Sequence, residues 1–465
     1  MYLLDAESNI PLHIQLYEAL KYDITSNLKI GSKLPSIRKI AQEYKISKNT
    51  VESAYGQLYA EGYIESRPKS GYYVADARHA PFNIPPARNT REDIAPAYRY
   101  DFFPARLSKE SFPTKLWKRL FTKAIDDTLD FGAYSDGQGE PGLRWEITRY
   151  LRESRAVKCD ASQVIVTGAF MDGMAMIADL LQSHTKRFAI EHPGYHIARK
   201  VFERFGYAVR KVPVGNDGID IDALCASDAR IAYITPSHQY PTGVTIPISN
   251  RLKLLAWSQN VDGFIIEDDY DSELTYRSRP IPSLQGLDTN DRVIYIGTFS
   301  KALSPALRIG YVVLPYRLLP EYRKFHIHFP RVALMIQKTL ELFMRDGHWE
   351  RHLRRVRNLN RKKHDLMKQA LVTYLGDSMK IVSEGGGLAI NIRPRSELDM
   401  ETLRSKAEAT GLKLYFAKEN AGGEWEAIRM GFGGLREEEI EPAVKAFAAV
   451  WFSDQSLGPI QKNGL

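Results

Sequence analysis

The chain has 465 residues, a formal net charge of +8, and a composition that is 44% hydrophobic and 26% charged. A chain of this length is too long for a single hydrophobic core, so we expect at least two domains, and the composition excludes a disordered chain. The chain has only two cysteines, Cys159 and Cys225, which argues against a disulfide framework or a structural metal. No run approaches the roughly 18 apolar residues that cross a bilayer, and the N-terminus lacks the pattern of a secretory leader, so we expect a cytoplasmic protein without membrane contact.

The first 76 residues carry the pattern of three helices followed by a hairpin. Apolar residues recur every fourth position from Leu12 to Ile24, which predicts an amphipathic helix. Ser36 and Ser47 each precede a short apolar pattern and are suitable N-caps, so we expect a second and a third helix to begin there. The β-prone segments YIESR and GYYV are separated by three turn residues and predict a two-stranded wing.

These segments together resemble the winged helix-turn-helix of the GntR family. The resemblance is carried, in order, by P-L-x-x-Q-L, G-x-K-L-P-S-x-R-x-I-A, S-K-N-T-V, A-Y-x-x-L-x-x-E-G-Y and K-x-G-Y-Y-V. It implies double-stranded DNA as a partner, read by the start of the third helix and by the wing. The implied DNA contacts are Arg38, Ser47, Lys48, Asn49, Thr50, Ser53, Lys69 and Gly71. Residues 1–78 hold ten Lys and Arg against nine Asp and Glu, so this prediction rests on pattern and not on local charge.

A stretch rich in Pro, Ala and charges, residues 77–99, predicts a linker. Beyond it, β-prone runs alternate with helical patterns, which predicts a mainly parallel sheet covered by helices, with ligands at the carboxyl ends of the strands. The expected strands are residues 164–170, 187–192, 230–237, 263–270 and 292–299.

Polar side chains at the ends of these strands suit one chemistry. Lys301 directly follows a strand and Ser300, where a buried lysine is placed to form a Schiff base with an aldehyde. Asp268 ends another strand, where a buried carboxylate can keep a pyridinium nitrogen protonated. Tyr270, two residues on, faces the same way and can reach the phenolic oxygen of the ring, and Tyr195 is suited to cover the ring face.

A phosphate requires N–H donors and a guanidinium. The predicted phosphate ligands are Gly168, Ala169 and Phe170 at a helix start, together with Thr298, Ser300 and Arg308.

The ordered set resembles the fold-type I aminotransferases over about residues 100–452. The resemblance is carried by Y-S-x-x-x-G-x-x-x-L-R, H-P-G-Y, T-P-S-H-Q-Y-P-T-G, E-D-D-Y-D-S-E and G-T-F-S-K-A-L-S-P-A-L-R-I-G-Y. With the GntR-like segment in front, the chain resembles a MocR/GabR-type regulator. The resemblance implies pyridoxal 5'-phosphate bound to Lys301 and a domain-swapped, head-to-tail homodimer.

The expected fold class is therefore multidomain, with an α+β winged helix-turn-helix followed by an α/β aminotransferase-like body. The expected boundaries are 1–76 for the DNA-binding domain, 77–99 for the linker, 100–452 for the body and 453–465 for the tail. Within the body we expect a large subdomain at about 130–325 and a small C-terminal α+β subdomain at about 345–452.

Departures from the aminotransferase pattern bear on turnover. Tyr240 stands where most aminotransferases have the Asn that contacts the ring oxygen, so either His238 or Gln239 takes over that contact or it is lost. Phe170 replaces a small or hydroxyl residue at the phosphate turn, and Asp268 and Tyr270 are one residue closer than usual. These changes leave coenzyme binding intact and put efficient transamination in doubt.

Arg429 lies in the β-prone run AIRMGFGGL, which resembles the segment where aminotransferases bind the substrate α-carboxylate. The presence of Arg429 in this segment favours an α-amino acid, or the coenzyme itself, as the effector. The predicted function is a coenzyme-dependent transcriptional regulator of vitamin B6 or amino-acid metabolism. The alternative is a working aminotransferase with a fused DNA-binding domain.

Residues 345–363 hold eight Arg and Lys against Asp346 and Glu350, with apolar residues at helical spacing. This pattern predicts an amphipathic helix with a cationic outer face. Most such faces are merely solvated. We hypothesise that this one contacts DNA that runs past the body.

Overall fold

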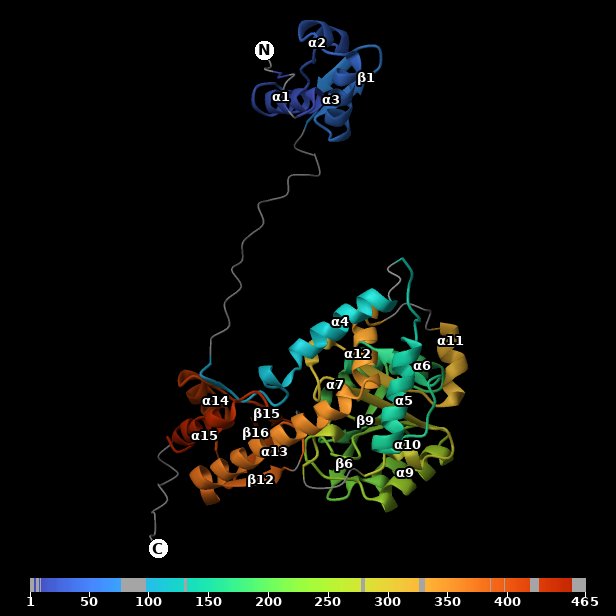
Figure 1. Cartoon of the computed structure of the whole chain (residues 1–465), viewed down its shortest axis with the longest axis vertical. Coiled ribbons are helices and arrows are strands. Elements are labelled where there is room, and N and C mark those ends of the chain that lie inside the picture. Colours follow the sequence, from blue (N-terminus) through green and yellow to red (C-terminus); the bar gives the residue numbers. More distant parts are fainter. Residues whose placement is uncertain are drawn as a thin grey trace. The chain divides into compact units, whose positions relative to one another are not determined.

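The computed structural model describes residues 4–5, 8, 10–76, 98–128, 132–276, 281–325, 331–384, 386–396, 398–418 and 426–453. The chain divides into two compact units, Met1–Pro96 and Ala97–Leu465, which we call the head and the body (Figure 1). Most of the expected linker and nearly all of the expected tail lie outside the described residues.

The head consists of three helices and one hairpin. These elements are α1 (Leu12–Ser26), α2 (Ile37–Glu43), α3 (Lys48–Ala60), β1 (Ile64–Arg67) and β2 (Gly71–Val74). Both predicted caps are confirmed, because Ser36 Oγ accepts a hydrogen bond from the amide of Lys39 (3.2 Å) and Ser47 Oγ accepts one from Thr50 (3.1 Å). The predicted apolar faces of α1 and α3 pack together around the fully buried Tyr55, and β1 pairs with β2 antiparallel.

The body is built on an eight-stranded sheet in the order β4-β11-β10-β9-β8-β5-β6-β7. Its strands are β4 (Val164–Thr167), β5 (Arg187–His192), β6 (Ala208–Gly215), β7 (Gly218–Ile219), β8 (Ile231–Ile234), β9 (Phe264–Asp269), β10 (Val293–Thr298) and β11 (Gly310–Val313). All five predicted strands are present. The run from β10 to β6 is parallel, whereas β11 pairs antiparallel with β10 and β4, and β7 with β6. The mainly parallel α/β sheet is thus confirmed.

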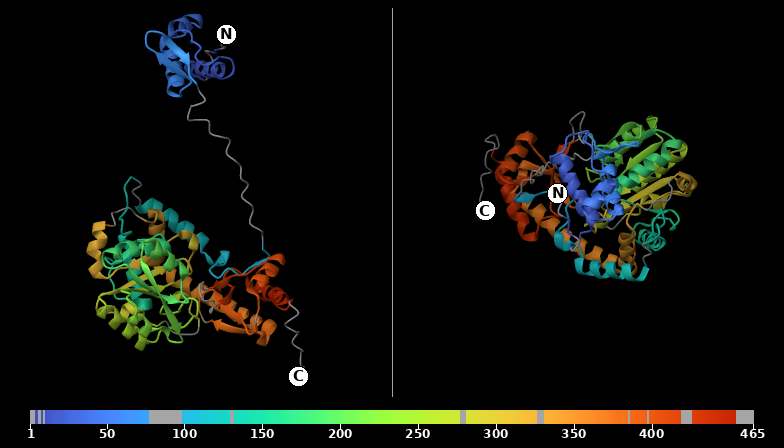
Figure 2. Two further views of the ribbon diagram at one scale, coloured as in Figure 1. Left: turned by 180° about the vertical axis from the view of Figure 1, so that it is seen from behind. Right: turned by 90° about the horizontal axis from the view of Figure 1, so that it is seen from above.

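Helices cover both faces of this sheet (Figures 1 and 2). They are α4 (Thr114–Thr128), α5 (Pro141–Arg155), α6 (Phe170–Leu180), α7 (His196–Arg204), α8 (Ile221–Ala226), α9 (Ile248–Asn260), α10 (Leu284–Leu287), α11 (Leu319–Phe325) and α12 (Leu334–Arg345). Neighbouring residues of β4 point to opposite faces, so Val164 and Val166 join the core beneath α5 and α12, while Ile165 joins the core beneath α6 and α7. Burial on both faces explains why these strands are almost continuously apolar.

The C-terminal part of the body is a smaller α+β subdomain. Its antiparallel sheet has the order β12-β13-β16-β15, formed by β12 (Met379–Ser383), β13 (Ala389–Pro394), β15 (Phe416–Lys418) and β16 (Glu426–Gly431). It packs with the C-terminal half of α13 (His348–Leu375), with α14 (Met400–Ala409) and with α15 (Glu437–Trp451). A short parallel pair joins β14 (Leu412–Lys413) to β3 (Tyr100–Asp101).

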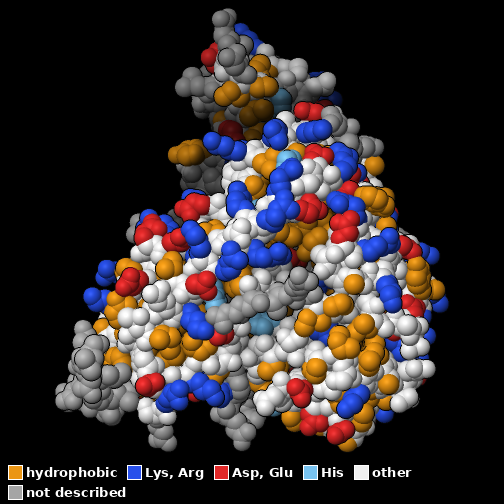
Figure 3. Space-filling model, turned by 60° about the horizontal axis from the view of Figure 1, so that its bottom comes forward, with side chains coloured by type: hydrophobic (Ala, Val, Ile, Leu, Met, Phe, Trp, Pro, Cys, Tyr) orange, Lys and Arg blue, Asp and Glu red, His pale blue; other side chains and the backbone are white. Residues whose placement is uncertain are grey.

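Residues 348–363 of the basic stretch form the start of α13, which runs from the large part of the body into the small one (Figure 1), whereas Arg345 is the last residue of α12. Trp349, Leu353 and Val356 are buried, so the predicted amphipathic helix is confirmed. Arg351, Arg354 and several other basic residues are exposed. On the face of the molecule in Figure 3, basic and acidic side chains lie interspersed. The structure does not test the hypothesis that α13 contacts DNA.

Candidate functional site

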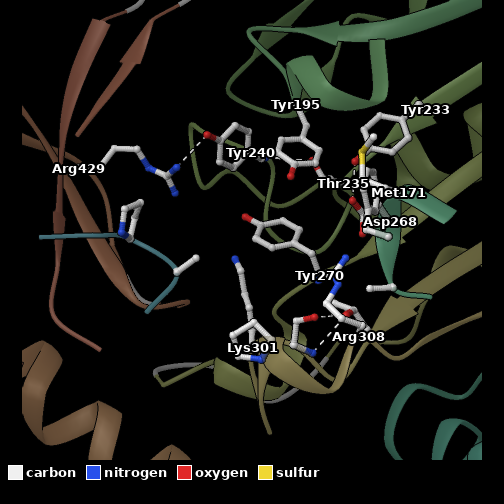
Figure 4. A pocket seen from close by; sticks show the side chains of 17 residues that line it. Met171, Tyr195, Tyr233, Thr235, Tyr240, Asp268, Tyr270, Lys301, Arg308 and Arg429 are labelled. Atoms are coloured by element: carbon white, nitrogen blue, oxygen red, sulfur yellow. Dashed lines mark hydrogen bonds between the residues drawn. The ribbon is translucent and has the colours of Figure 1, made fainter. Parts of the chain in front are cut away.

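A cavity of about 320 Å³ opens at the carboxyl ends of β4, β8, β9 and β10. Because β8, β9 and β10 are parallel neighbours, their ends meet at one edge of the sheet. The predicted residues that line this cavity are Ala169, Phe170, Tyr195, Asp268, Tyr270, Thr298, Ser300, Lys301, Arg308 and Arg429 (Figure 4). Segments about 260 residues apart in the chain therefore converge on one site.

Lys301 lies just beyond β10 with its amine pointing into the cavity (Figure 4). Its Nζ is 4.0 Å from the centroid of the Tyr270 ring and 4.0 Å from Oδ2 of Asp271. Burial lowers the pKa of Lys301 to about 8, and the nearby Asp271 carboxylate opposes that shift. A larger fraction of the amine is therefore neutral and nucleophilic near pH 7 than in an exposed lysine.

Asp268 lies at the end of β9 and is buried. The hydroxyl of Tyr233, on the neighbouring strand β8, donates a hydrogen bond to its Oδ2. Burial raises the pKa of Asp268 to about 7, although the Tyr233 hydrogen bond favours the charged form. Oδ1 of Asp268 accepts no hydrogen bond from the described residues, so it can accept one from a protonated ring nitrogen. The positive charge of that nitrogen would favour the ionised form of Asp268.

The predicted phosphate end is built on the start of α6. Ala169, Phe170 and Met171 line the cavity there, and Thr298 Oγ1 donates to Ser300 Oγ (2.9 Å). Gly168 differs from the prediction, because its amide donates to Oδ2 of Asp172 (2.8 Å) and is not available to a phosphate in this arrangement. The remaining donors are the amides at the helix start, the hydroxyl of Ser300 and the guanidinium of Arg308.

Arg429 enters the cavity from β16 in the small subdomain (Figure 4). Its Nη1 donates to the hydroxyl of Tyr240 (2.8 Å), and its Nε is buried with no hydrogen-bond partner among the described residues. Within the same residues, no carboxylate pairs with either Arg429 or Arg308. Both guanidiniums can therefore take an anionic group.

The structure distinguishes the two residues proposed to replace the missing Asn. Gln239 is fully buried, and its amide nitrogen donates to Glu191, to the carbonyl of Pro193 and to the carbonyl of Tyr240, while its oxygen accepts from Thr242. Its hydrogen-bonding capacity is used within the protein, so the assignment of Gln239 to the coenzyme is corrected to a role in holding its loop.

His238 does not line the main cavity. Its Nδ1 lies 2.9 Å from Oδ2 of Asp271 and 3.3 Å from the hydroxyl of Tyr270. It borders a small adjoining cavity of about 20 Å³ that Lys301 also lines. Burial alone would raise the pKa of Asp271, but His238 and Lys301 lower it overall, so Asp271 is an anion beside the lysine.

Sequence reasoning missed Tyr233, Thr235 and Asp271. Tyr233 carried a usable signal, because it is the only residue with a polar group in the otherwise apolar strand β8. Asp271 is the last residue of the D-D-Y-D motif, and nothing in the motif itself distinguishes its role. Its importance depends on the distance to Lys301, which is 30 positions further along the chain.

In the head, all but one of the predicted DNA contacts are exposed. The exposed residues are Arg38, Ser47, Lys48, Asn49, Ser53, Lys69 and Gly71, and the exception, Thr50, is half-buried. Lys48, Asn49 and Thr50 form the first turn of α3 after its Ser47 cap. Their positions leave them accessible to a nucleic acid.

The described residues contain no cluster of His, Cys, Asp or Glu suited to a metal ion. Among the helices of the described part of the chain, none is long and apolar enough to cross a membrane.

Two family models match the chain. The model described as bacterial regulatory proteins, gntR family, matches residues 12–74, and the model described as aminotransferase class I and II matches residues 106–447. The first is a DNA-binding family, and the second depends on pyridoxal phosphate.

Two relatives align with this chain over nearly its whole length. The chain is 34% identical over 461 residues to the uncharacterized HTH-type transcriptional regulator YhdI of Bacillus subtilis (strain 168), covering 96% of this chain and 97% of that protein. It is 32% identical over 487 residues to the "Probable rhizopine catabolism regulatory protein MocR" of Rhizobium meliloti, covering 99% and 98%.

Among solved structures, a multiple substrate aminotransferase from Thermococcus profundus superposes with a TM-score of 0.68 at 22% identity, covering 77% of this chain and 92% of that chain. At this identity the similarity shows the fold of the body.

Proposed function

Because the chain belongs to the MocR-type family of transcriptional regulators, we propose that its body holds pyridoxal 5'-phosphate as a sensor. The coenzyme, or its adduct with an amino acid, is the signal. The head binds double-stranded operator DNA, and the signal changes how it binds.

One observation carries this proposal. Lys301 and the buried Asp268 share a cavity with two arginines, Arg308 and Arg429, that have no carboxylate partner among the described residues. In the close-up the two guanidiniums lie on opposite sides of Tyr270 (Figure 4). This arrangement suits a phosphate at one end and a carboxylate at the other.

When bound, pyridoxal phosphate supplies an aldehyde that condenses with amines and a ring that withdraws electrons. Lys301 would hold the aldehyde carbon, and Asp268 would keep a proton on the ring nitrogen. Arg308, Ser300 and the start of α6 would bind the phosphate. Tyr195 would cover the ring, since its side chain borders the cavity. Burial raises the pKa of Tyr195 to about 12, so its phenol is neutral near pH 7.

The protein would act as a head-to-tail homodimer whose two heads bind repeated half-sites. A ligand can change DNA binding only if it has different affinities for two arrangements of that dimer. Arg429 in the small subdomain and Lys301 in the large one would both contact a coenzyme–amino acid adduct, so the adduct can favour one arrangement of the two subdomains.

The test is a titration of the full-length protein with pyridoxal phosphate alone and then with amino acids. Coenzyme absorbance and binding to its own upstream DNA are measured together. We expect absorbance of the bound coenzyme that is lost in Lys301→Ala and kept in Lys253→Ala, an exposed lysine on α9. We also expect a ligand-dependent change in DNA affinity that Lys301→Ala abolishes. A protein that takes up no coenzyme would contradict the proposal.

The alternative, a working aminotransferase, is tested in the same preparation. Multiple turnovers with a panel of α-amino acids at ordinary enzyme rates would support catalysis as the main activity. We expect at most slow, residual transamination, because Tyr240 replaces the ring-contacting Asn and Gln239 is not free to act in its place.

A further inference from the structure

Tyr240 links the two subdomains of the body at the edge of the cavity. It lies on the loop after β8, and its hydroxyl accepts a hydrogen bond from Nη1 of Arg429 on β16 (2.8 Å). The guanidinium carbon of Arg429 is also 4.9 Å from the centroid of the Tyr240 ring. A cation over an aromatic ring is attracted to its face, so the two side chains orient each other.

The loop that carries Tyr240 is tightly held. The amide of Tyr240 donates to Thr235 Oγ1 (3.0 Å), and its carbonyl accepts from the side chain of Gln239 (2.7 Å). The next residue, Pro241, accepts a hydrogen bond from Asn391 of the small sheet (2.9 Å). Because the backbone is anchored on both sides, the phenol is presented to the cavity in a defined position.

Two donors at this end of the cavity, the Tyr240 hydroxyl and Nε of Arg429, have no acceptor among the described residues. A phenol has one proton, and since the Tyr240 hydroxyl accepts from Arg429, that proton remains for another acceptor. Among the described residues no acceptor for it is found, and Nε of Arg429 likewise has no partner there. Tyr240 and Arg429 are half-buried residues, but Nε of Arg429 is itself buried and requires an acceptor. A carboxylate supplies two oxygens and the balancing charge.

We propose that Tyr240 is a specificity-determining residue whose hydroxyl donates to the carboxylate that Arg429 binds. Together the two residues select amines that carry a carboxylate next to the amino group over amines that lack it. The inference rests on the proposed function, because it places the ligand at the coenzyme. An amine without a carboxylate would leave both the phenol and the guanidinium without an acceptor, and such unpaired groups strongly reject a ligand.

The experiment uses full-length protein loaded with pyridoxal phosphate and follows ligand binding by the shift in coenzyme absorbance. The probes are matched pairs that differ only in the carboxylate: L-alanine with ethylamine, L-phenylalanine with phenethylamine, and L-lysine with cadaverine. Tyr240→Phe should raise the Kd of the amino acids about tenfold or more and change that of the amines less than about twofold. Tyr316→Phe, at an exposed tyrosine, is the control and should change neither.

Arg429→Gln separates this inference from the proposed function. A large loss of amino-acid affinity in Arg429→Gln with none in Tyr240→Phe would overturn the role of Tyr240 and leave the proposed function standing. An equal loss for amino acids and amines in Tyr240→Phe would make Tyr240 merely structural, and tighter amino-acid binding would make its hydroxyl a competitor, so both results overturn the inference. A normal coenzyme spectrum in each variant verifies that the site has folded.

Discussion

The head and the body present their functional residues in opposite ways. In the head, Ser47, Lys48, Asn49 and Thr50 are consecutive, exposed, and positioned by a single helix start. In the body, Lys301, Asp268 and Arg429 lie far apart in the sequence and meet only through the packing of two sheets. A DNA-binding surface needs a protruding element, whereas a coenzyme site needs a desolvated cavity with charges of both signs. Once each unit is folded, DNA binding by the head therefore depends on single exposed side chains, whereas coenzyme binding by the body depends on how distant segments pack.

The largest expected effect tests whether the two units are independent. Tyr55 is fully buried in the head and donates to the carbonyl of Pro35 (2.8 Å). Tyr55→Ala should cost the head about 3–5 kcal/mol of unfolding free energy, which would unfold it and abolish DNA binding. Coenzyme absorbance should persist.

Thermal unfolding followed by circular dichroism, together with coenzyme titration, checks this prediction. Tyr59→Ala is the matched control, because Tyr59 is 55% exposed on the same helix and its loss should leave the head folded. Loss of coenzyme binding in Tyr55→Ala would show that the body depends on the head.

The next effect concerns buried charge in the body. Burial raises the pKa of Glu191 from 4.5 to about 7, although hydrogen bonds from Thr235 and Gln239 oppose the shift. The folded state therefore disfavours the ionised form, so the contribution of Glu191 to stability is present below about pH 4.5 and is lost as the pH rises through about 7. Glu191→Gln stays neutral and should be more stable than the unaltered protein at pH 8, by about 2–3 kcal/mol, and similar to it near pH 4.5.

Denaturant unfolding of the coenzyme-free protein at several pH values measures this difference. Glu203→Gln, at an exposed position on α7, should show no such dependence. A constant difference between Glu191→Gln and the unaltered protein across this pH range would contradict the prediction.

Smaller effects are expected at the surface of the head. Asn49→Ala should relax discrimination between operator sequences by about 1–3 kcal/mol, since an amide reads base edges. Lys48→Ala should weaken binding to all sequences alike and make the salt dependence shallower by about one unit of slope, since a lysine neutralises phosphate. Fluorescence anisotropy with matched and altered operators at several salt concentrations separates the two roles, and identical behaviour of the two variants would argue against them.

The last prediction, and the one that would most change the comparison, concerns α13. If its cationic face contacts DNA, replacing Arg354, Arg355 and Arg361 by Glu should lower DNA affinity and flatten its salt dependence. Charge reversal at the exposed Lys115, Lys118 and Lys123 of α4 is the control. Unchanged affinity and salt slope would confine DNA contact to the head.

Much of this organisation was predictable from sequence because it depends on neighbours in the chain. Ser36 and Ser47 act as caps since their partners are three residues away, and the parallel strands were evident from short apolar runs. Gly168 and Gln239 were assigned to the coenzyme because their motifs usually contact it. Their hydrogen bonds to Asp172 and Glu191 depend on how the loops pack, which no motif reports.

By itself, the sequence determined the two-part organisation, the three helices and wing of the head, the strand ends of the body, and the identity of Lys301, Asp268 and Arg308 as chemically significant residues. Each of these follows from local spacing or from a motif in one segment. Only the tertiary structure decided that Tyr233 supports Asp268, that Asp271 lies beside Lys301, and that Tyr240 bonds to Arg429 across two subdomains. These are contacts between distant segments, and they depend on how strands and loops pack, a property that residue spacing along one segment does not encode.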